Sequence, residues 1–185
     1  MFSRDEVSLR PVDWADKDQM YPWVCDSELE VLSGWGTPRS KTSYEAKFRS
    51  FLENPPGDLV VFAIEHRGEL VGRIELAEVA HEHRRASLGL FVGDKRKRGS
   101  GIGSSAVIIM LDYAFKGMNL ERVCAYTYSF NERARRLMLS VGFVEEGLLR
   151  AHEYHNGEAR DMYVYGMLAR DFYKRYETLF GIPEP

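Results

Sequence analysis

The sequence predicts an α+β (mixed α/β) fold in which helices pack on one central, mostly antiparallel sheet. Segments with the two-residue period of a half-buried strand alternate along the chain with segments that have the 3.6-residue period of an amphipathic helix. The 185 residues, of which 44% are hydrophobic and 29% charged, have the size and composition of one ordinary globular domain. Because no repeat or linker divides them, we expect a single domain over residues 1–185.

The first half of the chain predicts a strand, two helices and three further strands. The first strand covers Val7–Arg10, and Asp13 can cap the helix that follows. A loop over Leu32–Lys41 comes next, before Thr42 or Ser43 caps the second helix. The three later strands are rich in branched apolar residues, and turn residues separate them. They cover Leu59–Ile64, Leu70–Val79 and Ala86–Val92.

The second half begins with a change from the strand period to the helix period. Over Gly101–Phe115 the apolar residues fall on one helical stripe, and Gly117 supplies a stop. A strand, a helix, a hairpin that turns at Asn156-Gly157 and a terminal helix complete the chain. The strand covers Arg122–Tyr128, the helix Asn131–Val141, and the hairpin Phe143–Glu153 and Ala159–Leu168. The whole order predicts a sheet of about seven strands flanked by helices.

Charge, cysteine and histidine patterns argue against a nucleic-acid-binding, membrane, disulfide-bonded or metal-binding protein. A formal net charge of -3 gives no overall attraction to nucleic acid or to an anionic membrane, so we expect neither as a partner. Cys25 and Cys124 lie far apart without a Cys-x-x-Cys pattern, which predicts free thiols. The first residues are charged and no apolar run is long enough for a membrane span, so we expect a cytoplasmic protein. His81-Glu82-His83 lacks a third ligand, and we expect no metal site.

The most informative segment runs from Val92 to Ser105, between the end of a predicted strand and the start of a helix. Gly99, Gly101 and Gly103 stand there at alternate positions, and glycines let backbone N–H groups converge. A helix N-terminus with free N–H groups and neighbouring basic side chains binds anions. The ligand that suits this segment best is a pyrophosphate.

Three other interpretations of this segment need weighing. Residues Gly101–Ala106 satisfy the loose G-x-G-x-x-A dinucleotide pattern, but antiparallel hairpins precede them and the next strand lacks a closing acid. A Walker loop needs Gly-Lys-Ser or Gly-Lys-Thr, which the chain does not contain. A solvated basic turn with capping glycines stays open, although three alternating glycines exceed what a cap requires.

Arg98-x-x-Gly101-x-Gly103 resembles the R/Q-x-x-G-x-G/A pattern of the Gcn5-related N-acetyltransferases (GNAT), at the start of their long central helix. Several short motifs further along are similar to the second half of that family. They are Asn131-Glu132-Arg133-Ala134, Val141-Gly142-Phe143, Glu146-Gly147 with Arg150, and Gly157 with Asp161. This ending and the two N-terminal helices resemble the branch that contains ribosomal-protein alanine acetyltransferases and spermidine acetyltransferases.

The resemblance implies acetyl-CoA as the co-substrate and a sheet that splays at the cofactor cleft. The glycine loop would hold the pyrophosphate through backbone N–H groups, the strand before it would meet the pantetheine arm, and Asn131 would touch the cofactor. The implied cofactor-binding residues are Leu90, Phe91, Val92, Arg98, Gly99, Ser100, Gly101, Ile102, Gly103, Ser104 and Asn131. Lys95–Lys97 would reach the outer phosphates of the nucleotide or, in the simpler interpretation, stay solvated.

The catalytic groups depart from the family pattern. Many members carry a glutamate on the strand before the phosphate loop, where this chain has Ser87, so Glu75 on the preceding strand is the candidate base. Relatives often have a tyrosine where this chain has Met138, which leaves Tyr128 as the candidate proton donor. The alternatives are Glu78 and Tyr126.

The resemblance therefore implies an enzyme that transfers acetyl to a primary amine, either a protein N-terminus or a small amine, by direct attack in a ternary complex. A non-catalytic acyl-CoA-binding sensor or interaction module of the same fold is the alternative. Asp26, Glu28 and Glu30 would suit a polycationic acceptor or form a solvated helix face. A homodimer is compatible with the resemblance.

Overall fold

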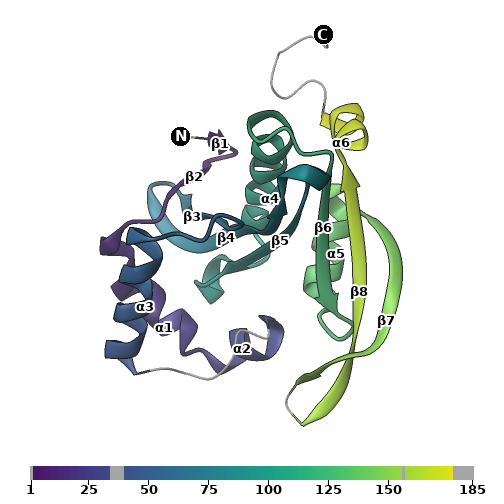
Figure 1. The fold of residues 1–185 in the computed structure, drawn as a ribbon. Helices are drawn as coiled ribbons and strands as arrows, with labels where there is room; N and C mark the ends of the chain where they lie inside the picture. Colours follow the sequence, from purple (N-terminus) through teal and green to yellow (C-terminus); the bar gives the residue numbers. More distant parts are fainter. Residues whose placement is uncertain (1, 34–39, 156, 177–185) are drawn as a thin grey trace.

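The computed structural model describes residues 2–33, 40–155 and 157–176, and these contain one eight-stranded sheet (Figure 1). The strand order is β1-β2-β3-β4-β5-β6-β8-β7, and all neighbours are antiparallel except β5 and β6. The strands are β1 (Phe2–Arg4), β2 (Val7–Pro11), β3 (Val60–His66), β4 (Glu69–Ala80), β5 (Arg85–Val92), β6 (Arg122–Tyr128), β7 (Val144–His155) and β8 (Glu158–Leu168). The predicted mostly antiparallel mixed sheet is confirmed, with β1 as an additional edge strand.

Helices cover both faces of this sheet. They are α1 (Lys17–Val24), α2 (Ser27–Ser33), α3 (Lys41–Glu53), α4 (Ile102–Asp112), α5 (Glu132–Val141) and α6 (Ala169–Tyr176). Short helical turns join some of the elements: η1 (Trp14–Asp16), η2 (His81–His83), η3 (Lys95–Lys97) and the π-helical turn η4 (Tyr113–Gly117). None of the described helices is long and apolar enough to cross a membrane.

Side chains alternate between the two faces of the sheet along each strand, and a separate hydrophobic core lies on each face. Ile64 and Ile74 are fully buried in the larger core, which contains α4, while Ala63 and Leu70 belong to a smaller core with Met20 of α1 and two aromatic residues of α3. Nearly every residue of α4 is buried, which explains why this helix is apolar on all sides rather than amphipathic. Figure 1 shows α4 against the middle of the sheet.

Several predicted boundaries differ from the structure. The second long helix begins at Lys41 and its cap is Ser40, whose Oγ accepts a hydrogen bond from the Ser43 N–H at 3.2 Å, so the predicted cap at Thr42 or Ser43 is wrong. The helix predicted over Gly101–Phe115 changes from α to π geometry after Asp112, and the π turn η4 ends at Gly117, the predicted stop. Of the predicted loop and turn, residues 34–39 and Asn156 lie outside the described residues.

Candidate active site

The strands β5 and β6 pair along only part of their length. The parallel ladder joins Arg85–Leu88 to Arg122–Ala125, and beyond it β5 continues to Val92 and β6 to Tyr128 without pairing between them. On their outer sides both strands stay paired, β5 with β4 and β6 with β8. The predicted splay of the sheet lies here, and the backbone groups on the two facing inner edges are open to a ligand.

A cavity of about 590 Å³ fills this split. Its walls come from β5, β6, the loop after β5, the first turn of α4, one face of α5 and two leucines of α2, Leu29 and Leu32. Most of the predicted site residues line it: Leu90, Phe91, Val92, Arg98, Gly99, Gly101, Gly103, Ser104, Asn131 and Tyr128. The structure therefore brings the predicted cofactor loop and the candidate proton donor together in one cavity.

Three predicted site residues do not line the cavity. The Ser100 hydroxyl donates a hydrogen bond to the Lys97 carbonyl at 2.6 Å, within the loop. Ile102 is the first residue of α4, and its side chain is buried in the core. Glu75 lies on β4, one strand away from the split.

The loop after β5 has the backbone geometry of an anion site. Gly99 and Gly101 have φ values of +82° and +87°, which side chains other than glycine rarely adopt. Gly101 is the N-cap residue of α4, and no side chain caps this helix. The first N–H groups of an eleven-residue helix therefore point at the cavity without a side-chain partner.

The Arg98 side chain holds this loop in place. Its guanidinium donates hydrogen bonds to the Val92 carbonyl at 2.8 Å and to the Gly93 carbonyl at 3.4 Å, at the end of β5. It also forms an ion pair with Glu28 of α2 at 3.0 Å, and only 7% of the side chain is exposed. Arg98 thus joins the loop after β5 to α2, and its charge is already matched by a carboxylate.

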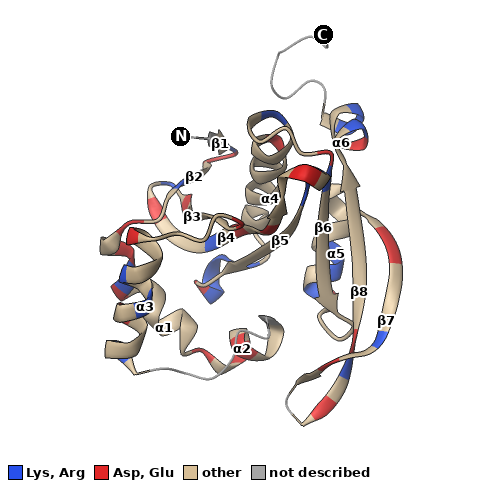
Figure 2. Ribbon diagram, in the orientation of Figure 1, with Lys and Arg blue, Asp and Glu red and all other residues tan. Residues whose placement is uncertain are grey.

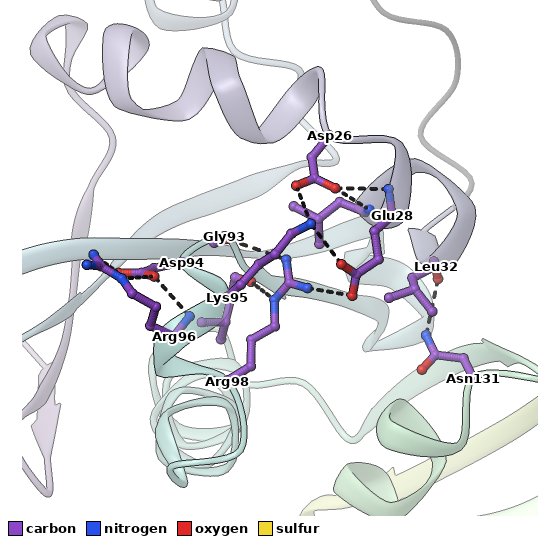
Figure 3. A network of polar contacts seen from close by, with 11 residues as sticks. Asp26, Glu28, Leu32, Gly93, Asp94, Lys95, Arg96, Arg98 and Asn131 are labelled. Carbon is purple, nitrogen blue, oxygen red and sulfur yellow. Dashed lines mark hydrogen bonds and ion pairs between the residues drawn. The ribbon is translucent and has the colours of Figure 1, made fainter.

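The other basic residues of the loop are paired in the same way, and Figure 3 shows the pairs of Lys95 and Arg96. Lys95 contacts Asp26 at 3.0 Å and Glu28 at 2.8 Å, and Arg96 contacts Asp94 at 3.0 Å. Lys97 pairs with Glu69 of β4. Figure 2 shows the blue basic loop that follows β5 and, below it, the red acidic residues at the start of α2.

The other end of α2 is tied to the opposite side of the split. The Asn131 side-chain amide donates a hydrogen bond to the Leu32 carbonyl at 3.2 Å, while its Oδ1 caps α5 by accepting from the Ala134 N–H at 3.1 Å. His155 Nε2 of β7 lies 3.2 Å from the Val31 carbonyl. The helix α2 therefore spans the mouth of the cleft (Figure 1) and contacts both of its sides.

Tyr128 is fixed at the end of β6 by three neighbours. Its ring stacks between Phe130 and His155, with centroid distances of 5.1 and 5.3 Å. Its hydroxyl donates a hydrogen bond to Glu153 Oε2 at 2.5 Å. Burial and the neighbouring Glu153 carboxylate raise the pKa of Tyr128 well above its usual value, so the phenol keeps its proton and acts as a donor.

The Glu75 side chain occupies the space beside Gly89, the neighbouring residue on β5. It lies opposite Gly89 of β5, and a Cβ added at Gly89 would lie 3.2 Å from Glu75 Oε1. Arg73 pairs with this carboxylate, which is 17% exposed. Gly89 itself lines the cavity, so the Glu75 carboxylate lies next to the cavity wall without forming part of it. By contrast, Glu78 accepts a hydrogen bond from the Ser87 hydroxyl at 2.9 Å and is exposed.

Sequence reasoning did not identify several residues of the site. Leu29 and Leu32 of α2, Glu153 of β7, and Arg133 and Arg136 of α5 contact the cavity or a residue in it. The helical spacing of Arg133 and Arg136 places them on one face and could have been recognised, whereas the contacts of α2 and Glu153 depend on tertiary structure.

The site fits a nucleotide with a long amide arm. The uncapped start of α4 matches a pyrophosphate, and the free inner edges of β5 and β6 match the amide groups of a pantetheine chain. Among the described residues, no group of three or more His, Cys, Asp or Glu side chains could hold a metal ion.

Comparisons with known proteins agree with this geometry. Residues 6–144 match the acetyltransferase (GNAT) domain family. YdaF of Bacillus subtilis, a putative ribosomal N-acetyltransferase, is 33% identical over 174 residues, which cover 91% of this chain and 94% of that protein. The spermidine N(1)-acetyltransferase of Escherichia coli is 28% identical over 171 residues, which cover 87% of this chain and 85% of that protein.

A solved structure shows the same fold. The spermidine N-acetyltransferase from Vibrio cholerae, crystallised in complex with CoA and spermine, gives a TM-score of 0.82 at 22% identity. The comparison covers 91% of this chain and 99% of that chain.

Fold and site together define an enzyme of the acyltransferase class that takes its acyl group from a coenzyme A thioester. The chain belongs to the GNAT acetyltransferase family. It is an N-acetyltransferase with acetyl-CoA as co-substrate, and the relatives include both ribosomal and spermidine N-acetyltransferases, as the predicted branch requires.

Proposed function

We propose that the chain acetylates the primary amine of a protein N-terminus or of a small amine, by direct attack while acetyl-CoA and amine are bound together. One observation carries this proposal: a single cavity passes through the split between β5 and β6 and is lined by α4 and α5 as well as by α2. The phosphate loop supports the cofactor at α4, and the acceptor has room beside α2 and the tip of β6. Holding both reactants in one cavity supplies proximity, a large part of the acceleration in such reactions.

The amine must lose its proton before it attacks. An alkylamine with a pKa near 10.4 is about 0.1% neutral at pH 7, so a base increases the reactive fraction. We propose Glu75 for this role, acting through a water, because its carboxylate lies beside Gly89 at the cavity wall. The ion pair with Arg73 holds the carboxylate in this position.

Tyr128 is the proposed proton donor to the departing thiolate. Its hydroxyl already donates to Glu153, and its raised pKa makes it a weak acid. A thiolate with a pKa near 8.5 on the cysteine scale departs without full protonation, so we expect Tyr128 to contribute less than Glu75.

The acidic residues of α2 do not favour a polycationic acceptor. Asp26 and Glu28, which would suit a polyamine, are paired with Lys95 and Arg98. A protein N-terminus therefore suits this site at least as well as a polyamine does. The Escherichia coli relative is named for a polyamine, spermidine.

Free thiol release from acetyl-CoA tests the proposal, with a panel of short peptides, polyamines, amino acids and amino sugars as acceptors. We expect amine-dependent release, with E75Q lowering kcat about 100-fold while the affinity for CoA stays unchanged. E78Q is the matched control, on the same strand and with the same loss of charge, and should keep wild-type turnover. Tight CoA binding without release across the panel would favour the sensor alternative, and equal effects of E75Q and E78Q would exclude Glu75 as the base.

Location and assembly stay predictions. Two free cysteines, Cys25 and Cys124, support a cytoplasmic location. A homodimer is supported by exposed apolar side chains on α5 and β7, namely Leu139, Val144 and Leu148. Sedimentation equilibrium of the full chain measures the assembly.

A further inference from the structure

The basic loop after β5 has little charge left for the outer phosphates of a nucleotide. Lys95 and Arg98 are held by Asp26 and Glu28, Lys97 by Glu69, and Arg96 by Asp94. In addition, 88% of the Arg96 side chain is exposed, and neither Lys95, Arg96 nor Lys97 lines the cavity. The basic residues that were expected either to reach the outer phosphates or to stay solvated therefore stabilise the loop through ion pairs.

Apart from Arg98, whose charge Glu28 matches, the cations that line the cavity come from the helix α5. Arg133 and Arg136 are one helical turn apart, and Ser140 continues the same face. Arg133 has no ion pair with any residue that the structure describes. Arg136 lies 3.8 Å from Glu132, with 73% of its side chain exposed, and such an exposed pair is weak and easily replaced.

Arg135, the third arginine of α5, makes contacts outside the cavity. The Arg135 guanidinium lies 4.0 Å from the centroid of the Tyr163 ring and pairs with Glu132 at 3.0 Å. Arg135 does not line the cavity. Of the three arginines on α5, two therefore face the cavity and one is engaged outside it.

The cationic face of α5 lies beside the phosphate loop. A Cβ added at Gly103 would lie 3.4 Å from Leu137 Cδ2, so the first turn of α4 and this part of α5 are in near contact. Leu137 follows Arg136 directly and lies one turn after Arg133. A pyrophosphate at the start of α4 therefore has the cationic face of α5 beside it.

We propose that Arg133 and Arg136 bind the 3′-phosphate of the coenzyme A nucleotide and make the site selective for coenzyme A over its 3′-dephospho form. The inference rests on the placement of the pyrophosphate at the start of α4. Arginine suits the role because its planar guanidinium matches a phosphate with paired, charge-assisted hydrogen bonds.

Calorimetric titration with CoA and with 3′-dephospho-CoA tests this proposal. We expect the wild-type chain to bind CoA at least about tenfold more tightly than 3′-dephospho-CoA, and R133A/R136A to lose this preference while binding 3′-dephospho-CoA as the wild type does. R96A/K97A removes the same charge from the basic loop and should keep the wild-type preference. Thermal unfolding of each variant confirms that the fold is intact.

The outcomes separate this proposal from the one on which it rests. An unchanged preference in R133A/R136A, or loss of the preference in R96A/K97A, would overturn the role of α5. A wild-type chain that binds both ligands equally well would also overturn it and leave the pyrophosphate site intact. Failure of the wild-type chain to bind either ligand would instead refute the pyrophosphate site itself.

Discussion

Gly89 decides how close the Glu75 carboxylate can come to the cleft. The two residues face each other across β4 and β5, and the space that a side chain at Gly89 would fill holds the Glu75 side chain. A strand glycine usually weakens a sheet, so its presence here indicates that the close approach has a use. This arrangement offers a carboxylate to the site although Ser87 stands where relatives carry a glutamate.

The substitution G89A tests this arrangement. The added Cβ would meet Glu75 Oε1 at 3.2 Å and Cγ at 3.3 Å, which displaces the end of a flexible side chain rather than backbone. We therefore expect kcat to fall about tenfold with little change in the melting temperature or in the affinity for CoA. G147A is the control, because a Cβ there meets nothing within 4 Å. Unchanged turnover in G89A would argue against Glu75 as the general base.

The element that connects the two halves of the site is α2. Its first turn contacts the phosphate loop through Asp26 and Glu28, and its last turn contacts Asn131 and His155. The helix has only seven residues, too few for stability in isolation. Its helical state therefore depends on these tertiary contacts.

Hydrogen exchange of the α2 amides measures this dependence. E28Q removes the charge that holds Lys95 and Arg98, and we expect exchange over α2 to become about fivefold faster. E30Q makes the same change two residues away, at a side chain with no basic partner among the described residues, and should exchange like the wild type. Equal exchange rates in E28Q and the wild type would show that apolar packing alone holds α2.

At the scale of the whole molecule, paired carboxylates and buried tyrosines set the pH range of stability. Burial acts to raise the pKa of Asp16 and Asp26, but ion pairs with Arg10 and Lys95 outweigh burial and lower the pKa of both carboxyls. Because the folded-state pKa is lowered, stabilisation is complete above about pH 4 and is lost as the pH falls through the folded-state value. Burial raises the pKa of Tyr44 to about 12, so stability also falls as the pH rises above about 10, where the unfolded chain ionises first.

Urea unfolding at a series of pH values measures these limits. We expect the highest midpoint at neutral pH, a decline below about pH 4 and a second decline above about pH 10. D16N removes one of the paired carboxyls and should reduce the slope of the acid decline, whereas E30Q should leave it unchanged. An acid decline of equal slope in D16N would place the pH dependence elsewhere.

Local sequence signals predicted the parts of the fold that local contacts specify. The strand Arg122–Tyr128 agrees with β6 at both ends, and Asn131 stands at the start of α5 as its cap. The position of the glycine loop between a strand and a helix was predicted as well, since the loop and the helix after it are contiguous in sequence, and its contacts with the cofactor stay a prediction. The candidate bases and proton donors stay predictions.

The rest of the site could not be predicted because its contacts join distant parts of the chain. Glu28 and Arg98 are 70 residues apart, Leu32 and Asn131 are 99 apart, and Val31 and His155 are 124 apart. No period or motif reports such pairs. For the same reason the basic loop was expected to hold phosphates or stay solvated, whereas its charges are matched by α2 and β4.

The split between β5 and β6 gives this sheet two interior edges in addition to the two at its ends. An unpaired strand edge is a template for pairing with other chains, and proteins usually shorten or cover such edges. Here the interior edges are short, and α2 and α5 line the cavity between them. A ligand that hydrogen-bonds to these edges removes them as templates for another chain. We therefore expect the enzyme to aggregate more slowly during storage and heating when coenzyme A is bound.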